Sequence, residues 1–256
     1  MNTPKAIFFD LDGTVLSTGK LPDSAKEAIN YAKKKGVLLF TATGRHRKEF
    51  ENMPWFPDIP FDGFVTMNGA YSFITNKTIY KKPINKEAIS WVVEYLASNP
   101  MYCMFCEAKD IYANKEDEII NAGQIAYGLR VPPIRDPKTA LNGDVFQIVT
   151  FGKDIGDFLH QLPSCTITSW NENCYDIVPE GINKWVGILP MLDHFGLKPE
   201  EVAAIGDGEN DIEMLENAGY SIAMGNGINK VKQAANYVTT HIDDDGILNA
   251  IKHLLG

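Results

Sequence analysis

Two short acidic segments are the parts of this sequence best suited to chemistry, and the first contains Asp10 and Asp12. Both lie in DLDGT (10–14), directly after the apolar run AIFF (6–9). Open α/β sheets bind ligands in the crevice beyond the carboxyl ends of their strands, where two such carboxylates can meet. One carboxylate can attack as a nucleophile while the other transfers protons. Gly13 permits the sharp turn that this arrangement needs.

The second acidic segment is GDGEND (206–211), which follows the apolar run VAAIG (202–206). Carboxylates at a strand end supply hard oxygen ligands, and a few of them together with water and substrate oxygen suit Mg²⁺. The same residues are typical of an Asp- or Asn-capped helix start, and this structural role is compatible with metal binding.

Phosphate binding is indicated by two further features. Thr43 and Gly44 follow the apolar run VLLFT (37–41), and a hydroxyl with free backbone N–H groups at a strand-to-helix junction can cradle a phosphate. Lys184, in EGINKW (180–185), supplies a cation that can offset phosphate charge beside the acids. Taken singly, the first feature also fits a helix cap and the second a solvated lysine.

The segments that position these residues alternate strand and helix signals at both ends of the chain. Apolar runs at 6–9, 37–41, 63–67, 202–206 and 220–224 predict buried strands. Helices are expected at about 24–35, opened by a capping box at Ser24, and at 184–195, 210–217, 228–235 and from 245 onward. This order predicts βαβ units and an α/β fold with a Rossmann-like open parallel sheet.

Between these ends the pattern changes to α+β. A hairpin is expected over 71–82, turning near Asn76 and Lys77, then a helix over 85–98. Strands are expected at 101–107, 144–151, 165–170 and 174–179, with helices at 116–126 and 153–161. Pro132, Pro133 and Pro137 indicate a long irregular connection. We therefore predict a discontinuous core, residues 1–82 and 183–256, interrupted by an inserted domain at 83–182.

Composition restricts the partners. With 45% hydrophobic and 22% charged residues, the 256-residue chain is typical of globular proteins, which argues against disorder. A net charge of −9 repels phosphodiester backbones, so nucleic acid is not expected. The first apolar run is too short for a signal peptide and no apolar stretch is long enough to cross a bilayer, so we expect a cytoplasmic protein without membrane contact.

The cysteines do not change this interpretation. Cys103 and Cys106 form C-x-x-C, but on a predicted strand their thiols point to opposite faces. Neither a second C-x-x-C nor a helix opening at Cys103 completes a zinc or thioredoxin-like site. We expect buried or half-buried thiols, and the sequence does not indicate an oligomeric state.

In their order along the chain, the four motifs resemble the haloacid dehalogenase superfamily of phosphohydrolases. That family combines D-x-D-G-T, a Thr or Ser after the next strand, a Lys, and G-D-x-x-N-D. The long insertion and VTMNGA (65–70) are similar to the Cof-type subgroup, whose large α/β cap selects the substrate. The resemblance implies that Asp10 is the nucleophile and Asp12 the general acid/base, while Thr43 and Gly44 bind phosphate.

The resemblance also implies a role for the later motifs. Lys184 steadies Asp10 and the phosphoryl charge. Mg²⁺ is bound by Asp207, the Asp10 carboxylate and the Asp12 carbonyl, with Asp211 supporting the metal shell and Asn210 approaching the phosphate. Trp185 departs from the small residue that many relatives carry after the lysine, so the pocket shape does not transfer from them.

The expected activity is therefore Mg²⁺-dependent hydrolysis of a small phosphorylated metabolite, with sugar phosphates first and other monoesters such as pyridoxal phosphate next. A phosphomutase of the phosphomannomutase-like type shares the first motif and a similar cap, and it remains an alternative. A non-catalytic phospho-acceptor also uses acids and Mg²⁺ at strand ends. Asp12, a ready acid/base, and a large inserted domain argue against that simple switch.

Overall fold

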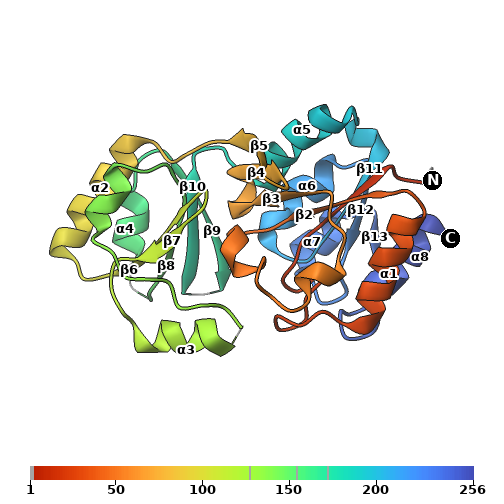
Figure 1. Cartoon of the computed structure of the whole chain (residues 1–256), viewed down its shortest axis with the longest axis horizontal. Coiled ribbons are helices and arrows are strands. Elements are labelled where there is room, and N and C mark those ends of the chain that lie inside the picture. Colours follow the sequence, from red (N-terminus) through yellow and green to blue (C-terminus); the bar gives the residue numbers. More distant parts are fainter. Residues whose placement is uncertain (1–2, 127, 154, 172) are drawn as a thin grey trace.

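Two β-sheets organise the chain in a computed structural model that describes residues 3–126, 128–153, 155–171 and 173–256 (Figure 1). Within the described residues, the larger sheet has eight strands in the order β13-β12-β11-β1-β2-β3-β4-β5. They are β1 (Ala6–Phe9), β2 (Leu38–Ala42), β3 (Gly63–Thr66), β4 (Tyr71–Ile74), β5 (Lys77–Lys81), β11 (Val202–Gly206), β12 (Tyr220–Ala223) and β13 (Tyr237–Val238).

The larger sheet is parallel from β13 to β3. Central strand β1 pairs in parallel with both neighbours, so that Ala6 lies opposite Leu38 of β2 and Val202 of β11. Its four residues are buried on both faces, which explains a continuous apolar run without alternation. The hairpin of β4 and β5 adds two antiparallel pairings at one edge, β3 with β4 and β4 with β5.

Helices cover both faces of this sheet. α1 (Asp23–Lys34) and α8 (Gly246–Leu255) pack together on one face, near both chain ends (Figure 1). α5 (Lys184–Phe195), α6 (Ile212–Asn217) and α7 (Asn229–Ala234) pack on the other. We call these helices and the larger sheet the core, and its three-layer architecture confirms the predicted Rossmann-like α/β class.

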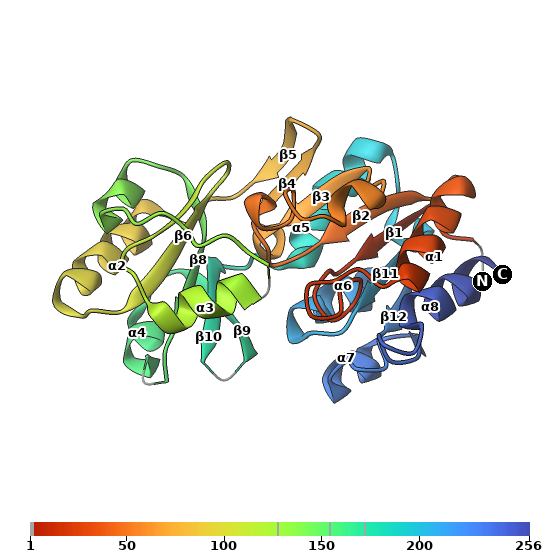
Figure 2. The ribbon, with the colours of Figure 1, turned by 60° about the horizontal axis from the view of Figure 1, so that its bottom comes forward.

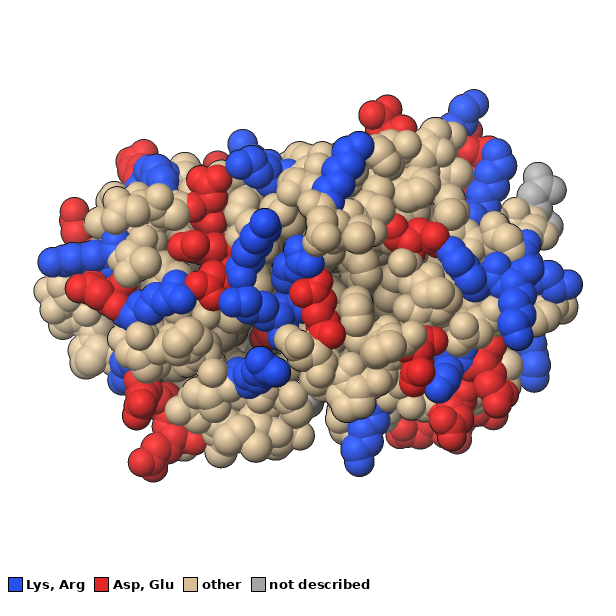
Figure 3. All heavy atoms as spheres, in the orientation of Figure 1, with Lys and Arg blue, Asp and Glu red and all other residues tan. Residues whose placement is uncertain are grey.

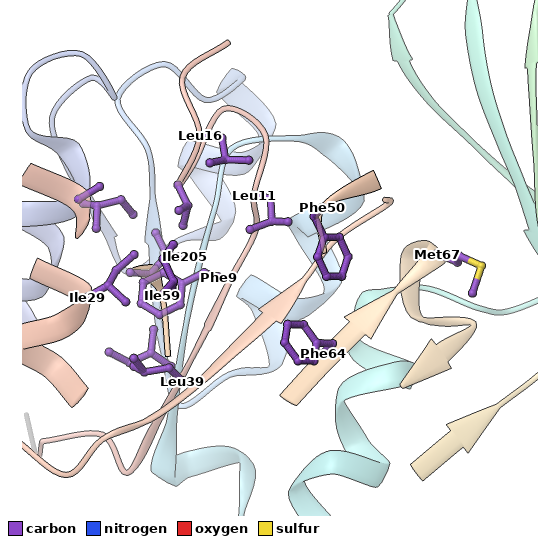
Figure 4. Close-up of a cluster of buried hydrophobic side chains, with 14 of the residues drawn as sticks. Phe9, Leu11, Leu16, Ile29, Leu39, Phe50, Ile59, Phe64, Met67 and Ile205 are labelled. Carbon is purple, nitrogen blue, oxygen red and sulfur yellow. The ribbon is translucent and has the colours of Figure 1, made fainter. Parts of the chain in front are cut away.

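A hydrophobic cluster fixes the position of the strand ends in the core. Figure 4 shows Phe9 of β1, Leu39 of β2 and Ile205 of β11 packed with Ile29 of α1. Leu11 follows β1 and is fully buried in the same cluster. Because Leu11 is anchored between Asp10 and Asp12, the loop that carries these two acids is held against the core.

The second sheet belongs to an inserted unit, defined here as the elements from α2 to β10. Its strands, in the order β7-β6-β8-β10-β9, are all antiparallel to their neighbours. They are β6 (Tyr102–Glu107), β7 (Ile111–Ala113), β8 (Val145–Phe151), β9 (Cys165–Asn171) and β10 (Cys174–Pro179). The helices are α2 (Lys86–Ser98), α3 (Glu118–Ala126) and α4 (Gly156–Gln161).

The two faces of the second sheet have different partners. Helices α2 and α4 cover the outer face (Figures 1 and 2). There Phe158 and Val92 belong to one buried hydrophobic cluster with Phe105. The inner face turns to the core, because Met104 and Val149 belong to the same cluster as residues of β1 and β3. The inserted unit therefore meets the core with the side chains of a sheet face.

The structure corrects several local expectations. α1 begins at Asp23 after an N-cap at Pro22 that makes no side-chain cap bond, so the capping box expected at Ser24 is wrong. β3 ends one residue early because Met67 turns to φ +51°. The helix expected at 210–217 begins with a 3-10 turn, Glu209–Asp211.

Several short elements were not expected, among them two strands and a 3-10 turn. Strands β7 and β13 have three and two residues, too few for a recognisable pattern. A 3-10 turn at Pro137–Leu141 lies inside the connection expected to be irregular. Its N-cap residue is Asp136, whose side chain accepts a hydrogen bond from Lys138 N. In the helix expected at 153–161, residue 154 lies outside the described residues.

Two further expectations concern the cysteines and the membrane. Cys103 and Cys106 are both buried and join clusters on opposite faces of β6, which confirms the predicted geometry. Across the part of the chain that the structure describes, every helix is too short or too polar to cross a bilayer.

Candidate active site

Three parallel strands bring the predicted motifs to one edge of the core. Asp10 follows β1, Thr43 follows β2, and Asp207 follows β11. Because β1 pairs with both β2 and β11 in parallel, the carboxyl ends of these strands meet at the same edge. The structure therefore gathers residues that lie far apart in the sequence.

Lys184 lies at the centre of this edge. Asn183 caps α5 by accepting from Val186 N, which places Lys184 in the first turn. The fully buried ammonium donates to Asp10 Oδ1 at 2.6 Å and to Asp211 Oδ1 at 2.5 Å. A buried lysine needs such charged partners, since the cost of desolvating an unpaired charge is several kcal/mol.

Asp207 is held beside this pair. Thr14 Oγ1 donates to Asp207 Oδ1 at 2.8 Å. The second oxygen of Asp211 accepts from the backbone N–H groups of Asp207 and Gly208. Gly13 has φ +81°, and a Cβ there would lie 2.2 Å from Asp207 Oδ2, so only glycine fits between the two acidic loops.

The electrostatics of the cluster follow from burial and repulsion. Burial raises the pKa of Asp10 well above its ordinary value, against the opposing effect of Lys184. Burial and the neighbouring Asp211 raise the pKa of Asp207 to about 6. Burial alone would lower the pKa of Lys184, but Asp10 and Asp211 raise it above its ordinary value. The cluster therefore contains three carboxyl groups and one ammonium group.

This donor set fits a hard divalent cation. Oxygen atoms from Asp10, Asp207 and Asp211 lie within 4.8 Å of one another. Carboxylates are the ligands that Mg²⁺ prefers, and a cation would offset the mutual repulsion that adds to burial in raising the pKa values of Asp10 and Asp207. Both oxygens of Asp211 are already engaged, one by Lys184 and the other by the backbone N–H groups of Asp207 and Gly208. Asp10 and Asp207 are therefore the carboxylates best placed to bind a cation.

The loop after β2 holds Asp12 through a residue that sequence reasoning did not select. Arg45 donates from Nε and Nη2 to the two oxygens of Asp12, at 2.6 and 2.7 Å. Asp12 stays about half exposed, whereas Arg45 is buried. The buried Thr43 hydroxyl accepts from Arg45 N. Arg45 was quoted within its motif, but nothing in the sequence paired it with Asp12.

A second residue that sequence reasoning did not select, Asn68, contacts Asn210 and lies close to Gly44. Asn210 Nδ2 donates to Asn68 Oδ1 at 2.8 Å. Asn68 Nδ2 donates to Gln147 Oε1 and Asp176 Oδ2 of the inserted unit. Gln147 Nε2 in turn donates to Gly44 O at 3.1 Å. The segment VTMNGA signalled Asn68 without a role, and no pattern signalled Gln147 or Asp176.

A cleft of about 560 Å³ opens from this cluster between the two units. Lys184, Asn68 and Asn210 lie at its inner end. The residues that line it include Thr166, Thr168, Ser169 and Tyr175 of the inserted unit and Glu209 and Glu213 of the core. In Figure 3, acidic and basic side chains are interspersed on one face, which is hollowed where the inserted unit meets the core.

Comparisons with known proteins agree on one family. A family model described as haloacid dehalogenase-like hydrolase matches residues 7–251. A solved structure, the HAD subclass IIB sugar phosphatase BT4131, is 36% identical, with a TM-score of 0.90 over 97% of this chain and 98% of that one.

Two curated relatives point the same way. "Putative phosphatase YkrA" of Bacillus subtilis is 28% identical over 98% of this chain and 97% of its own length. A Streptococcus pyogenes protein, "Putative bifunctional phosphatase/peptidyl-prolyl cis-trans isomerase", is 34% identical over 98% of this chain. The chain spans only 54% of the length of that second relative.

Proposed function

The chain belongs to the haloacid dehalogenase-like hydrolase family and is a phosphatase, and from this premise we propose how it acts. It hydrolyses small phosphate monoesters with Mg²⁺, through a phosphorylated Asp10. The observation that carries this proposal is the buried cluster in which Lys184 contacts Asp10 and Asp211 beside Asp207.

In the first step Asp10 attacks phosphorus. One carboxylate oxygen of Asp10 forms the new P–O bond, and Lys184, which donates to Oδ1, steadies the carboxylate. The bond from phosphorus to the leaving oxygen breaks, and Asp12 gives that oxygen a proton. Thr43 and the backbone N–H groups near Gly44 hold the phosphoryl oxygens in place.

In the second step water attacks the phosphoryl group on Asp10. Asp12 takes a proton from that water, the bond between phosphorus and Asp10 breaks, and inorganic phosphate leaves. When bound, Mg²⁺ at Asp10 and Asp207 supplies positive charge against the phosphoryl oxygens. Lys184 offsets the charge that accumulates on Asp10 and the phosphate.

Arg45 adds a constraint on the proton transfers. It holds both oxygens of Asp12 in the structure, so Asp12 must turn from the guanidinium before it can pass a proton. Because Asp12 is about half exposed, that turn needs no rearrangement of the core. Substrate phosphate offers Arg45 an alternative acceptor of the same geometry.

The leaving group fits the cleft between the two units. Its walls carry Thr166 and Thr168, whose hydroxyls can bond a polyhydroxylated group, while Glu213 repels a second anion. We propose sugar phosphates or similar metabolites as substrates, and the inserted unit as the cap that selects among them. The cytoplasm remains the proposed compartment.

A phosphate-release screen across phosphorylated metabolites, with and without Mg²⁺, tests the proposal. We expect Mg²⁺-dependent release from several sugar monophosphates and slower release from sugar bisphosphates. No release from any ester would refute hydrolysis. Retention of phosphate on an isomerised sugar, with a requirement for a bisphosphate activator, would instead identify a mutase.

A further inference from the structure

The side chain of Asn68 joins three parts of the molecule. Its Oδ1 accepts from Asn210 of the core, and its Nδ2 donates to Gln147 on β8 and to Asp176 on β10, at 3.1 and 2.9 Å. The carboxylate of Asp176 can only accept, so the orientation of the Asn68 amide is fixed by chemistry. Both N–H donors are used, and the residue is 1% exposed.

A strained turn holds Asn68 in this place. Met67, Asn68 and Gly69 all have positive φ, at 51°, 52° and 97°. Non-glycine residues rarely adopt this conformation, and two in a row cost energy that the surrounding contacts must supply. A Cβ on Gly69 would lie 2.0 Å from Asn183 O, so the turn is also pressed against the residue that precedes Lys184.

The inserted unit presents its two acceptors, Gln147 and Asp176, on the sheet face that turns to the core. On β6, Cys106 pairs with Gln147 and Glu107 pairs with Val145, which leaves Phe146 as an extra residue in β8. This β-bulge lies beyond Gln147, whose register is regular from Val149 opposite Met104 to Gln147 opposite Cys106. By strand alternation Gln147 therefore faces the core on the same side as Val149, and it also donates to Gly44 O, the carbonyl of the proposed phosphate loop.

We propose that Asn68 is a positioning residue that couples docking of the cap to the placement of Asn210 at the phosphate site; this inference rests on the proposed function. When the cap is docked, Gln147 and Asp176 hold the Asn68 amide, and its Oδ1 holds Asn210. When the cap lifts, the amide loses two acceptors, and Asn210 loses a fixed partner.

The substitution Asn68→Asp tests the coupling with little change of shape. The new carboxylate still accepts from Asn210, but it faces Gln147 Oε1 and the carboxylate of Asp176 with an acceptor in place of a donor. We expect kcat/KM for p-nitrophenyl phosphate and for glucose 6-phosphate to fall about 30-fold, the effect of buried hydrogen bonds left unsatisfied. Small-angle scattering should give a larger radius of gyration than for the wild type.

The double variant Asn68→Asp/Asp176→Asn supplies the rescue. Its new amide at position 176 can donate to the new carboxylate at position 68, so the cap docks again and kcat/KM should recover at least about tenfold over Asn68→Asp alone. The matched control, Asp176→Asn alone, keeps an acceptor for Asn68 and should lose only about threefold. In Asn68→Gly the backbone keeps its positive φ without strain, but the side-chain amide is gone. Its kcat/KM should fall about tenfold, and adding Asp176→Asn should not restore it.

The outcomes separate this inference from the proposed function. A wild type that hydrolyses neither ester overturns the proposed function, and the coupled placement of Asn210 fails with it. A wild type that hydrolyses while Asn68→Gly matches it shows that the amide has no role. A double variant as slow as Asn68→Asp, with the same radius of gyration, shows that Asn68 merely stabilises the turn.

Discussion

The core and the inserted unit approach the site in different ways. The core contributes the edge of a parallel sheet, where each strand ends in a loop. Residues of these loops, such as Asp10 and Asp12, face the ligand in the proposed mechanism. The inserted unit offers a sheet face, where every second residue of a strand points to the same side. Strand ends fix groups that perform chemistry, whereas a face supplies a surface that can change without moving them.

The buried charges differ in the same way. The core buries Lys184 among three acids, and the pKa values of Asp10, Asp207 and Lys184 depend on the charges of their neighbours as well as on burial. The cleft wall of the inserted unit carries neutral hydroxyls such as those of Thr166 and Thr168. A change in the core should therefore affect every ester, and a change on the cleft wall should affect esters selectively.

The largest effect is expected from Asp10→Asn. An amide is a poor nucleophile and cannot balance Lys184, so turnover should fall at least about a thousandfold for all esters. Circular dichroism should show an intact fold. Asp193→Asn, an exposed acid on α5, is the matched control and should keep its activity. More than about a tenth of the wild-type rate in Asp10→Asn would remove Asp10 from the nucleophile role.

Metal removal should also affect all esters alike. EDTA should abolish turnover, and Mg²⁺ should restore it. A readout without activity is the melting temperature, which saturating Mg²⁺ should raise by about 5 °C, because a cation bound only to the folded state stabilises it. Asp207→Asn should remove most of that shift. Full hydrolysis in metal-free buffer would contradict the metal site.

Smaller and selective effects should come from the cleft wall. Thr168→Val removes a hydroxyl at nearly constant volume, so kcat/KM for a preferred sugar phosphate should fall about tenfold or more. The value for p-nitrophenyl phosphate should change less than about twofold, because its ring makes no such bond. Thr139→Val, on the inserted unit but outside the cleft, is the control. An equal loss for all esters would mean that the inserted unit does not determine specificity.

The smallest effect on turnover should come from His46, which joins the two units. His46 Nε2 lies 2.7 Å from Glu107 O on β6, and Nδ1 accepts from Lys48 N, so the neutral ring is the form that both bonds require. Burial, followed by the charges of Lys48 and Arg47, lowers the pKa of His46 to about 4; Glu107 O and Asp110 act in the opposite direction.

Because the pKa of His46 is lowered in the folded state, we expect the free energy of unfolding to decrease in acid. The folded state binds its proton less readily than the unfolded state, so the contribution is complete above about pH 6.5 and is lost as the pH falls to about 4. Urea unfolding should show up to about 3 kcal/mol less stability over that window from His46. His46→Gln, which can donate to Glu107 O without titrating, should flatten the slope, and exposed His194→Gln should not.

Sequence patterns specified the core better than the details of the inserted unit. The strand AIFF and the motif after it are contiguous, so one short segment contains both the element and its chemistry. The cleft residues Thr166 and Thr168 share a face with Val178 and Asp176 of β10, and this common face depends on the register of β9 against β10, which includes a shift at Cys174.

The sequence also could not predict the two networks of side-chain hydrogen bonds in the site. Arg45 pairs with Asp12 and Asn68 with Asp176, contacts that span 33 and 108 positions. No local propensity encodes such pairs. The turn at Asn68 has positive φ in two non-glycine residues, a conformation that only tertiary contacts can impose. Site positions fixed by backbone turns were therefore predictable, and those fixed by contacts between units were not.

Direct trapping of a phosphorylated Asp10 tests the central claim, that the core edge alone performs the chemistry. Asp12→Asn is mixed with p-nitrophenyl phosphate, whose leaving group needs no protonation, and is then quenched in acid. We predict a burst of about one p-nitrophenol per enzyme and a hydroxylamine-labile phosphate that mass spectrometry places on Asp10. The absence of both the burst and the phosphoenzyme, or phosphate on another residue, would contradict the account.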